Sequence, residues 1–121
     1  MNHISVFNKL ARVDGLIAPV VIKVNPSADD TIPVNTSYLN ILRLAQRLEI
    51  AGVPYDLHRL QDGWQLCFYY RGKRADIIEN RGSFGGQMDL MESMGFKEDK
   101  GDVSGYLEIE DCLARIANFF M

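Results

Sequence analysis

The dipeptide Asp62-Gly63 constrains the fold of this chain more than any other short stretch. It separates two runs rich in aromatic and branched residues, Tyr55–Leu60 and Trp64–Tyr70. Asp-Gly is favoured in two-residue hairpin loops, because a type I′ turn requires positive φ at both central positions. We therefore predict an antiparallel hairpin, whose turn also determines which side chains face each other.

The residues on either side of this hairpin predict a third strand and three helices. Apolar residues at helical spacing predict a helix over 37–51, which Gly52 and Pro54 end. A turn at Gly72-Lys73 leads into a third strand, Ala75–Asn80. Two more helices follow, a short one carrying Met88, Met91 and Met94, and a final one carrying Ile109, Leu113, Ile116 and Phe120.

This order predicts the α+β class, with a three-stranded antiparallel meander and helices packed on one of its faces. A less regular segment precedes it, with a helix near Ile4–Ala11 and a strand at Val20–Val24. We expect a single domain over 1–121, in which residues 1–36 form an N-terminal extension and 37–121 the core.

Length and composition indicate a soluble protein. The chain has 121 residues, of which 47% are hydrophobic and 24% charged. No run approaches the roughly 20 apolar residues that span a bilayer, and the first ten residues lack the apolar stretch of a signal peptide. The lack of such segments predicts no membrane contact. Cys67 and Cys112 are too few for a disulfide framework, so we predict reduced thiols and a cytoplasmic location.

The predicted hairpin register assigns side chains to the two faces of the sheet. With Asp62 and Gly63 in the loop, the core face is mostly apolar, and Arg59 would have to reach an edge. The opposite face carries two rows of neighbouring side chains, Asp56–Tyr69–Asp76 and His58–Cys67–Ile78. We predict that this face is exposed.

A cysteine, a histidine and aspartates on one face allow a thiol-dependent enzyme using Cys67 and His58 as an alternative function. Neighbouring side chains on an open sheet form a shallow platform, without a cleft that excludes water or an evident oxyanion donor. We therefore assign no catalytic residues. His3, His58 and the two cysteines show no paired spacing typical of metal ligands, and we predict neither a metal nor a cofactor.

The stretch Gly82-Ser83-Phe84-Gly85-Gly86 could in principle hold an anion on its backbone amides. It matches neither a P-loop nor a dinucleotide-binding motif. The simpler interpretation is a tight turn that lets Phe84 pack against the rest of the protein.

Charge is distributed unevenly along the chain. Residues 87–121 contain eight acidic residues against three basic ones, and the net charge is −3. This favours a protein partner with a basic surface over general affinity for nucleic acid. The predicted acidic loop carries Glu98, Asp99 and Asp102.

Nucleic-acid binding is the main alternative, ahead of the thiol-dependent enzyme. A helix, three strands and a helix in this order resemble double-stranded-RNA-binding domains, and Tyr69–Arg74 is aromatic and basic. Those domains place lysines at the start of the last helix, where this chain has Glu108, Glu110 and Asp111. Base stacking on the sheet would also bring nucleic acid beside Asp56 and Asp76.

Four motifs resemble a pattern in short uncharacterised proteins of bacterial phages and mobile elements: Asp62-Gly63-Trp64-Gln65, Gly82-Ser83-Phe84-Gly85, Met94-Gly95 and Gly105-Tyr106-Leu107. The resemblance covers roughly residues 39–120 and implies an accessory or regulatory role.

Our leading hypothesis is a non-enzymatic protein that acts by binding another protein, with pairing to a second copy of itself left open. The predicted contact residues are Asp56, His58, Tyr69 and Asp76 on the sheet and Glu98, Asp99 and Asp102 in the acidic loop.

Overall fold

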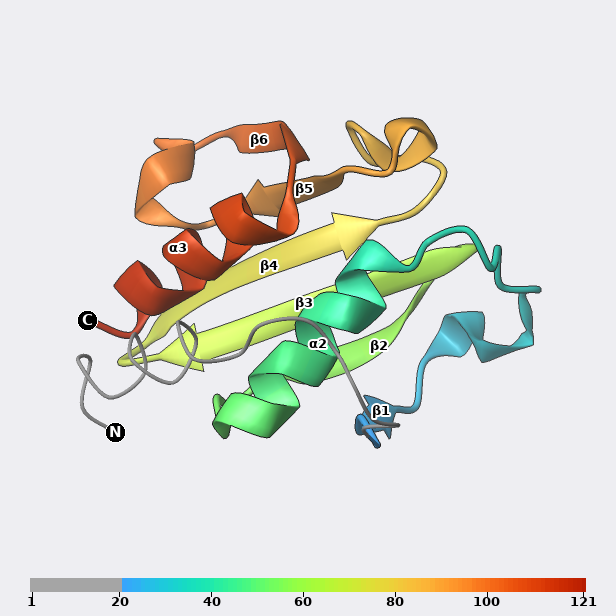
Figure 1. Ribbon diagram of the computed structural model, residues 1–121, viewed down its shortest axis with the longest axis horizontal. Coiled ribbons are helices and arrows are strands. Elements are labelled where there is room, and N and C mark those ends of the chain that lie inside the picture. Colours follow the sequence, from blue (N-terminus) through green and yellow to red (C-terminus); the bar gives the residue numbers. More distant parts are fainter. Residues whose placement is uncertain (1–20) are drawn as a thin grey trace.

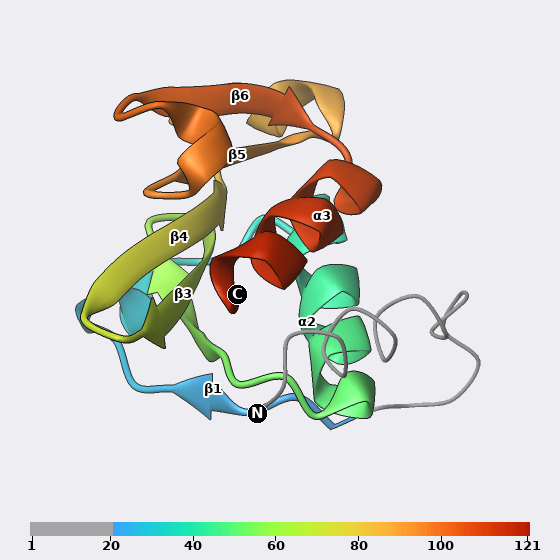
Figure 2. The same cartoon turned by 90° about the vertical axis from the view of Figure 1, so that its left-hand side faces the viewer.

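The computed structural model describes residues 21–121. In this part of the chain, six strands form one sheet in the order β1-β2-β3-β4-β5-β6, and two helices lie on one of its faces (Figures 1 and 2). The strands are β1 (Val24–Asn25), β2 (Asp56–Leu60), β3 (Gly63–Tyr70), β4 (Lys73–Glu79), β5 (Met91–Met94) and β6 (Val103–Leu107). The helices are α2 (Asn40–Ala51) and α3 (Ile109–Phe119), and 3₁₀ turns lie at Ala28–Thr31, Gly86–Met88 and Lys97–Asp99. The predicted α+β class is confirmed.

The sheet is larger than the predicted meander. Strands β2, β3 and β4 pair antiparallel in chain order, as predicted, and β5 and β6 continue the antiparallel order beyond β4. On the other side, β1 pairs in parallel with β2, and α2 connects the two strands. A parallel neighbour requires such a crossover, whereas the later strands need only short turns.

The predicted short helix around Met88–Met94 is wrong. Met91–Met94 is strand β5, in which Met91 and Ser93 are buried while Met94 is exposed. Spacing of three along the sequence fits one face of a helix, but Met91 and Met94 lie on opposite faces of a strand that alternates regularly, and the irregularity in its pairing is an extra residue on β6. Pairing with β5 also satisfies backbone groups that β4 would otherwise leave at an open edge. The predicted loop after Lys97 likewise contains most of β6.

The N-terminal predictions are only partly tested. The helix predicted near Ile4–Ala11 lies outside the described residues. Of the predicted strand Val20–Val24, only Val24 belongs to β1, which continues to Asn25.

Both hairpin turns lie one residue earlier than predicted. Leu60 pairs with Gly63, so the first turn consists of Gln61 and Asp62, and positive φ falls on Gln61 at 55°. Tyr70 pairs with Lys73, so the second turn consists of Arg71 and Gly72, with φ of 49° and 77°. Gly63 has a different role: a Cβ there would lie 2.0 Å from the backbone oxygen of Glu79. Glycine is required at this position by the close approach of β4, not by the turn.

The faces of the sheet nevertheless agree with the prediction. Moving a two-residue turn by one position changes each cross-strand partner by two residues, and an even shift leaves every side chain on its own face. Leu57, Leu66 and Ile77 therefore point inward and are fully buried. Only the neighbours on each face differ from those predicted.

The core lies between the inner face of the sheet and the two helices. From α2 it contains Ile41, Leu44 and Leu48, and from α3 Leu113 and Ile116, all buried. At one end of the core a cluster of rings packs largely edge to face, formed by Phe68, Tyr70, Phe96, Phe119 and Phe120. None of the helices described over 21–121 is long and apolar enough to cross a membrane.

Arg59 departs from its predicted position at an edge of the sheet. The side chain is buried and its guanidinium donates to three backbone carbonyls, of Gly63 at 3.1 Å, Ile32 at 2.7 Å and Gln61 at 3.0 Å. It also lies 5.4 Å from the centre of the Trp64 ring. Arg59 thus ties the segment before α2 to the first hairpin.

Candidate functional site

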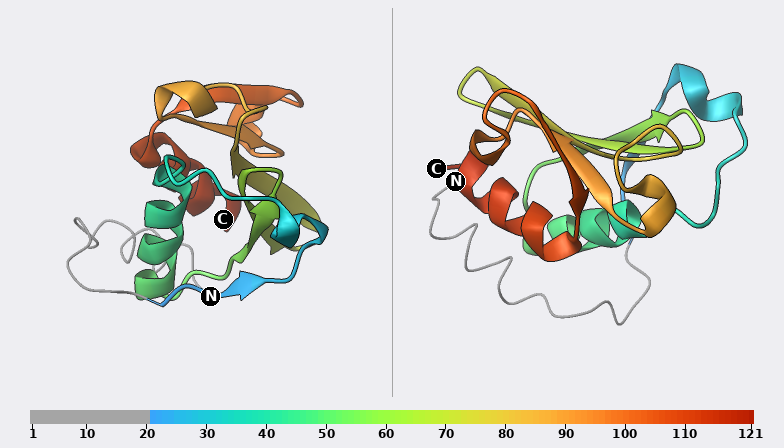
Figure 3. Two further views of the ribbon diagram at one scale, coloured as in Figure 1. Left: turned by 90° about the vertical axis from the view of Figure 1, so that its right-hand side faces the viewer. Right: turned by 90° about the horizontal axis from the view of Figure 1, so that it is seen from above.

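The outer face of the sheet, defined as the face opposite α2 and α3, is not covered by any described helix (Figures 2 and 3). Two large side chains stand out from it, Tyr69 at 59% and Met94 at 44% exposure. Around them lie half-buried side chains of mixed character. Pairing places the following residues on this face: Asn25, Asp56, His58, Gln65, Cys67, Tyr69, Arg74, Asp76, Ile78, Glu92, Met94 and Val103.

One row of the outer face is a polar network across three strands. The Asn25 amide on β1 donates to Oδ1 of Asp56 on β2. Nδ1 of His58 lies 3.6 Å from the same oxygen, and Nε2 of His58 lies 2.6 Å from Oε1 of Gln65 on β3. Each side chain in the row is held by its neighbour, so the row is already ordered in the free protein.

A second cluster lies beside it, centred on Arg74. The guanidinium donates to Oδ2 of Asp76 at 2.8 Å and to Sγ of Cys67 at 3.3 Å. Asp76 is buried and Arg74 is exposed. Tyr69 pairs directly with Arg74 across the strands. The predicted site residues Asp56, His58, Tyr69 and Asp76 thus share one face, but Asp76 lies beneath Arg74 and offers little surface.

The arrangement around Cys67 does not fit an activated thiol. Its cross-strand neighbours are Asp56 and Asp76, while His58 lies opposite Gln65. The predicted pairs, His58 beside Cys67 and Asp76 beside Tyr69, are therefore wrong by the two-residue shift. Burial raises the pKa of the Cys67 thiol; the charge of Arg74 lowers it, and Asp76 and Asp56 raise it further. A nucleophilic cysteine needs the opposite shift.

The three predicted residues of the acidic loop have different surroundings. Asp99 is buried: Oδ1 accepts from the Ser93 hydroxyl at 2.7 Å and Oδ2 from the backbone N–H of Phe96 at 3.0 Å. Arg115 on α3 approaches the same carboxylate at 3.5 Å. Glu98 accepts from the Asn118 amide at 2.8 Å, and of the three residues only Asp102 is exposed.

Other acidic residues of the C-terminal third also act within the molecule. Asp111 accepts from the backbone N–H of Glu108 at the start of α3, and Glu110 pairs with Arg47 on α2 at 3.1 Å. A run of acidic residues in the sequence has become a set of separate intramolecular contacts. The acidic loop does not form one continuous surface for a basic partner.

The glycine-rich loop holds Phe84 outward, which the sequence reasoning missed. The predicted tight turn exists, but the Phe84 ring is 55% exposed and so does not pack inside. Its backbone is fixed at both ends, because its N–H donates to Oε1 of Glu92 at 2.9 Å and its carbonyl accepts from the N–H of Tyr106 at 3.0 Å. Tyr106 is itself 57% exposed.

Gly105 makes this arrangement possible. A Cβ at position 105 would lie 2.4 Å from the Cβ of Phe84, so only glycine allows the loop to lie against β6. The signal available in the sequence is the co-occurrence of Gly-Ser-Phe-Gly with Gly-Tyr-Leu, but neither motif by itself indicates that the two segments meet.

Metal binding finds no support in this part of the chain. Over residues 21–121, no three or more histidine, cysteine, aspartate or glutamate side chains gather in a way that could hold an ion. The outer face offers fixed hydrogen-bonding groups together with the exposed side chains of Tyr69 and Met94.

Over residues 21–121, these features define an α+β fold in which no described helix covers one face of the sheet. Comparison with protein-family models, with curated proteins and with solved structures finds no match.

Proposed function

We propose that this protein is a non-enzymatic binding protein whose outer sheet face contacts another protein. The observation that carries the proposal is the ordered, uncovered outer face, on which Tyr69 and Met94 project from rows of mutually hydrogen-bonded side chains. The motif resemblance to short phage and mobile-element proteins is the ground for proposing an accessory or regulatory role.

Preorganisation favours such a contact. Binding requires interface side chains to lose rotamer freedom, at about 0.5–1.5 kcal/mol for each long side chain that becomes fixed. On the outer face, Asp56, His58 and Arg74 are already held by neighbours in the free protein. A partner therefore meets a surface that loses little further entropy on binding.

The types of side chain exposed on the outer face also favour contact with a protein. Tyrosine, methionine and arginine are enriched at protein interfaces, where a ring or thioether fills a pocket and a polar group keeps a hydrogen bond. Tyr69, Arg74 and Met94 bring these three types together across β3, β4 and β5. We propose Tyr69 as the anchor, with Asp56 and His58 on one side and Met94 on the other.

Site-specific photo-crosslinking tests this proposal. A photoreactive phenylalanine analogue is introduced in place of Tyr69 or of Met94, and crosslinked products from native-host extract are identified by mass spectrometry. The control position is Ile50, which is 51% exposed on α2, on the opposite side of the sheet. We expect the same protein to be captured from positions 69 and 94, and not from position 50.

Competition makes the result specific. Excess unmodified protein should abolish the crosslink, whereas the double variant Tyr69→Asp, Met94→Asp should compete poorly while retaining the native circular dichroism spectrum. Equal capture from all three positions, or full competition by the double variant, would argue against the outer face as the binding surface.

A further inference from the structure

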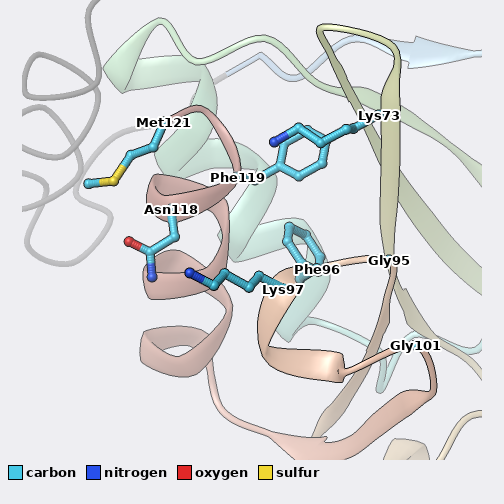
Figure 4. A pocket seen from close by; sticks show the side chains of 8 residues that line it. All are labelled: Lys73, Gly95, Phe96, Lys97, Gly101, Asn118, Phe119 and Met121. Atoms are coloured by element: carbon cyan, nitrogen blue, oxygen red, sulfur yellow. The ribbon is translucent and has the colours of Figure 1, made fainter.

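A second surface with different chemistry lies at the opposite side of the sheet. An open cavity of about 510 Å³ is bounded by the start of β4, the connection from β5 to β6, and the C-terminal end of α3 (Figure 4). The residues of its wall that matter for recognition are Lys73, Phe96, Lys97, Asn118 and Phe119. Lys73 is on the inner face of the sheet, one residue before Arg74 on the outer face, so the cavity is separate from the proposed binding face.

Two cations border the cavity. The Lys73 ammonium lies 5.3 Å from the centre of the Phe119 ring and 5.9 Å from that of Tyr70, and both contacts hold its stem along the aromatic cluster. Figure 4 shows the Lys73 and Lys97 side chains both extending toward the end of α3. None of the described residues lining the cavity is acidic, and the nearby Glu98 carboxylate accepts a hydrogen bond from the Asn118 amide at 2.8 Å.

The floor of the cavity is aromatic. Phe96 and Phe119 are buried, and their rings pack edge to face with centres 5.6 Å apart. Two positive groups over an apolar floor are complementary to a ligand that has a carboxylate close to an apolar side chain. Arg71 and Lys100 are exposed on the adjoining turns and extend the positive potential around the opening.

We infer that this cavity binds an acidic peptide segment, with a carboxylate between Lys73 and Lys97 and a neighbouring apolar side chain over Phe96 and Phe119. A peptide fits better than nucleic acid, because only a few cations border the cavity and the protein as a whole has a net charge of −3. This inference rests on the cavity alone. A failed test of the outer face would not affect it, and a failed test of the cavity would not affect the proposed function.

The alternative interpretation is that Lys73 and Lys97 have a purely structural role. Cations near the C-terminal end of a helix offset the partial negative charge of its last carbonyls, and α3 ends at this cavity. A purely structural role predicts that replacing the lysines lowers stability and that no acidic peptide binds at the site. The two roles are therefore distinguished by direct binding measurements on variants shown to be folded.

The test is NMR titration of the full 121-residue protein, labelled with ¹⁵N, with a short peptide alternating glutamate and leucine. We expect the largest amide shifts at Lys73, Gly95, Lys97, Gly101 and Asn118, the residues that surround the cavity. The matching peptide with glutamine in place of glutamate should bind at least about tenfold more weakly, because the charge interaction is lost.

Charge-reversal variants locate the site. Lys73→Glu with Lys97→Glu should weaken binding by at least about tenfold, whereas Lys23→Glu, an exposed position just before β1 and three strands away from β4, should not. Four outcomes would overturn the inference: no binding of the acidic peptide, equal binding of the glutamine peptide, shifts elsewhere on the protein, or tighter binding of a short single-stranded or duplex nucleic acid at the same residues.

Discussion

The carboxylate of Glu79 on β4 accepts a hydrogen bond from the backbone N–H of Ile41, at 3.0 Å, and thereby caps the N-terminus of α2. Its other oxygen accepts from the Asn40 amide at 3.2 Å. Leu39, at the N-cap position, cannot provide a side-chain cap of its own. Glu79 is fully buried, so a carboxyl side chain inside the protein connects the sheet to the start of α2.

Replacing Glu79 should show how much this cap contributes. Glu79→Ala leaves the Ile41 N–H without its partner inside the protein, and we expect it to lower the free energy of unfolding by about 2 kcal/mol. Glu79→Gln keeps an acceptor oxygen and should lose clearly less. Urea unfolding at neutral pH measures both variants; equal losses would mean that the hydrogen bond to Ile41 is not the important contact.

The same carboxylate makes stability depend on pH. Burial raises the pKa of Glu79 above its ordinary value of 4.5, and the hydrogen bonds from Ile41 and Asn40 only partly offset this. The folded protein therefore holds the proton to higher pH than the unfolded chain, and the contribution of Glu79 to stability falls as the pH rises above about 4.5.

Comparing the wild type with Glu79→Gln isolates this effect from the other titrating groups. We expect the wild type to lose stability relative to the variant between about pH 4.5 and neutrality, as measured by urea unfolding at a series of pH values. A difference that is constant over this range, or of opposite slope, would contradict the raised pKa.

Gly63 provides a test of close packing between strands. Because its Cβ would lie 2.0 Å from the carbonyl oxygen of Glu79, Gly63→Ala should destabilise the protein by at least about 3 kcal/mol. Gly72→Ala is the matched control, since nothing lies within 4 Å of its Cβ and only its φ of 77° is unfavourable. We expect that variant to lose about 1–2 kcal/mol. Thermal unfolding separates the two, and a similar loss for both would indicate that β4 can move away.

Asp99 and Asp102 should respond differently although they are neighbours in the acidic loop. Asp99→Asn replaces one of two acceptor oxygens that Ser93 and Phe96 use, and weakens the contact with Arg115. We expect a loss of about 2 kcal/mol in the free energy of unfolding. The exposed Asp102→Asn should leave the free energy of unfolding nearly unchanged. Denaturant titration measures both variants, and a similar loss for the two would contradict a structural role that is specific to Asp99.

Cys67 should react slowly with alkylating reagents in the folded protein. It is buried, and its raised pKa reduces the thiolate fraction near neutral pH. Burial also raises the pKa of Cys112, to about 12. We expect iodoacetamide to modify both thiols much more slowly than in urea, as followed by mass spectrometry. Fast modification of Cys67 that Cys67→Ala removes would restore the thiol-enzyme hypothesis.

The sequence predicted the central part of the fold because local signals there agree with tertiary packing. The apolar stripe of α2, its end at Gly52, and the alternation in β2, β3 and β4 each reflect burial on one side. The prediction was wrong at β5, because methionines at a spacing of three suit one face of a helix, whereas the strand has Met91 buried on one face and Met94 exposed on the other. Pairing with the edge of β4 favours the strand over the helix, and a local sequence pattern carries no information about that edge.

The candidate site was also predicted only in part. The period of two along strands assigned Asp56, His58, Tyr69 and Asp76 to one face, and an error of one residue in each turn left that assignment intact. The neighbours were wrong, because pairing depends on where the turn lies and not on alternation. The exposure of Phe84 and the cavity beside Lys73 depend on contacts between distant segments, which no local pattern records.

The Asp-Gly turn with its flanking strands, read alone, determined that this chain contains an antiparallel hairpin with one apolar and one mixed face. The tertiary structure decided the rest. The turn consists of Gln61 and Asp62, and the missing side chain of Gly63 allows β4 to approach β3 closely. It also buried Asp99 and divided the acidic residues among separate partners. The physical reason is that alternation and helical spacing are fixed by backbone geometry along the chain, whereas burial, charge pairing and close approach arise only when distant segments meet.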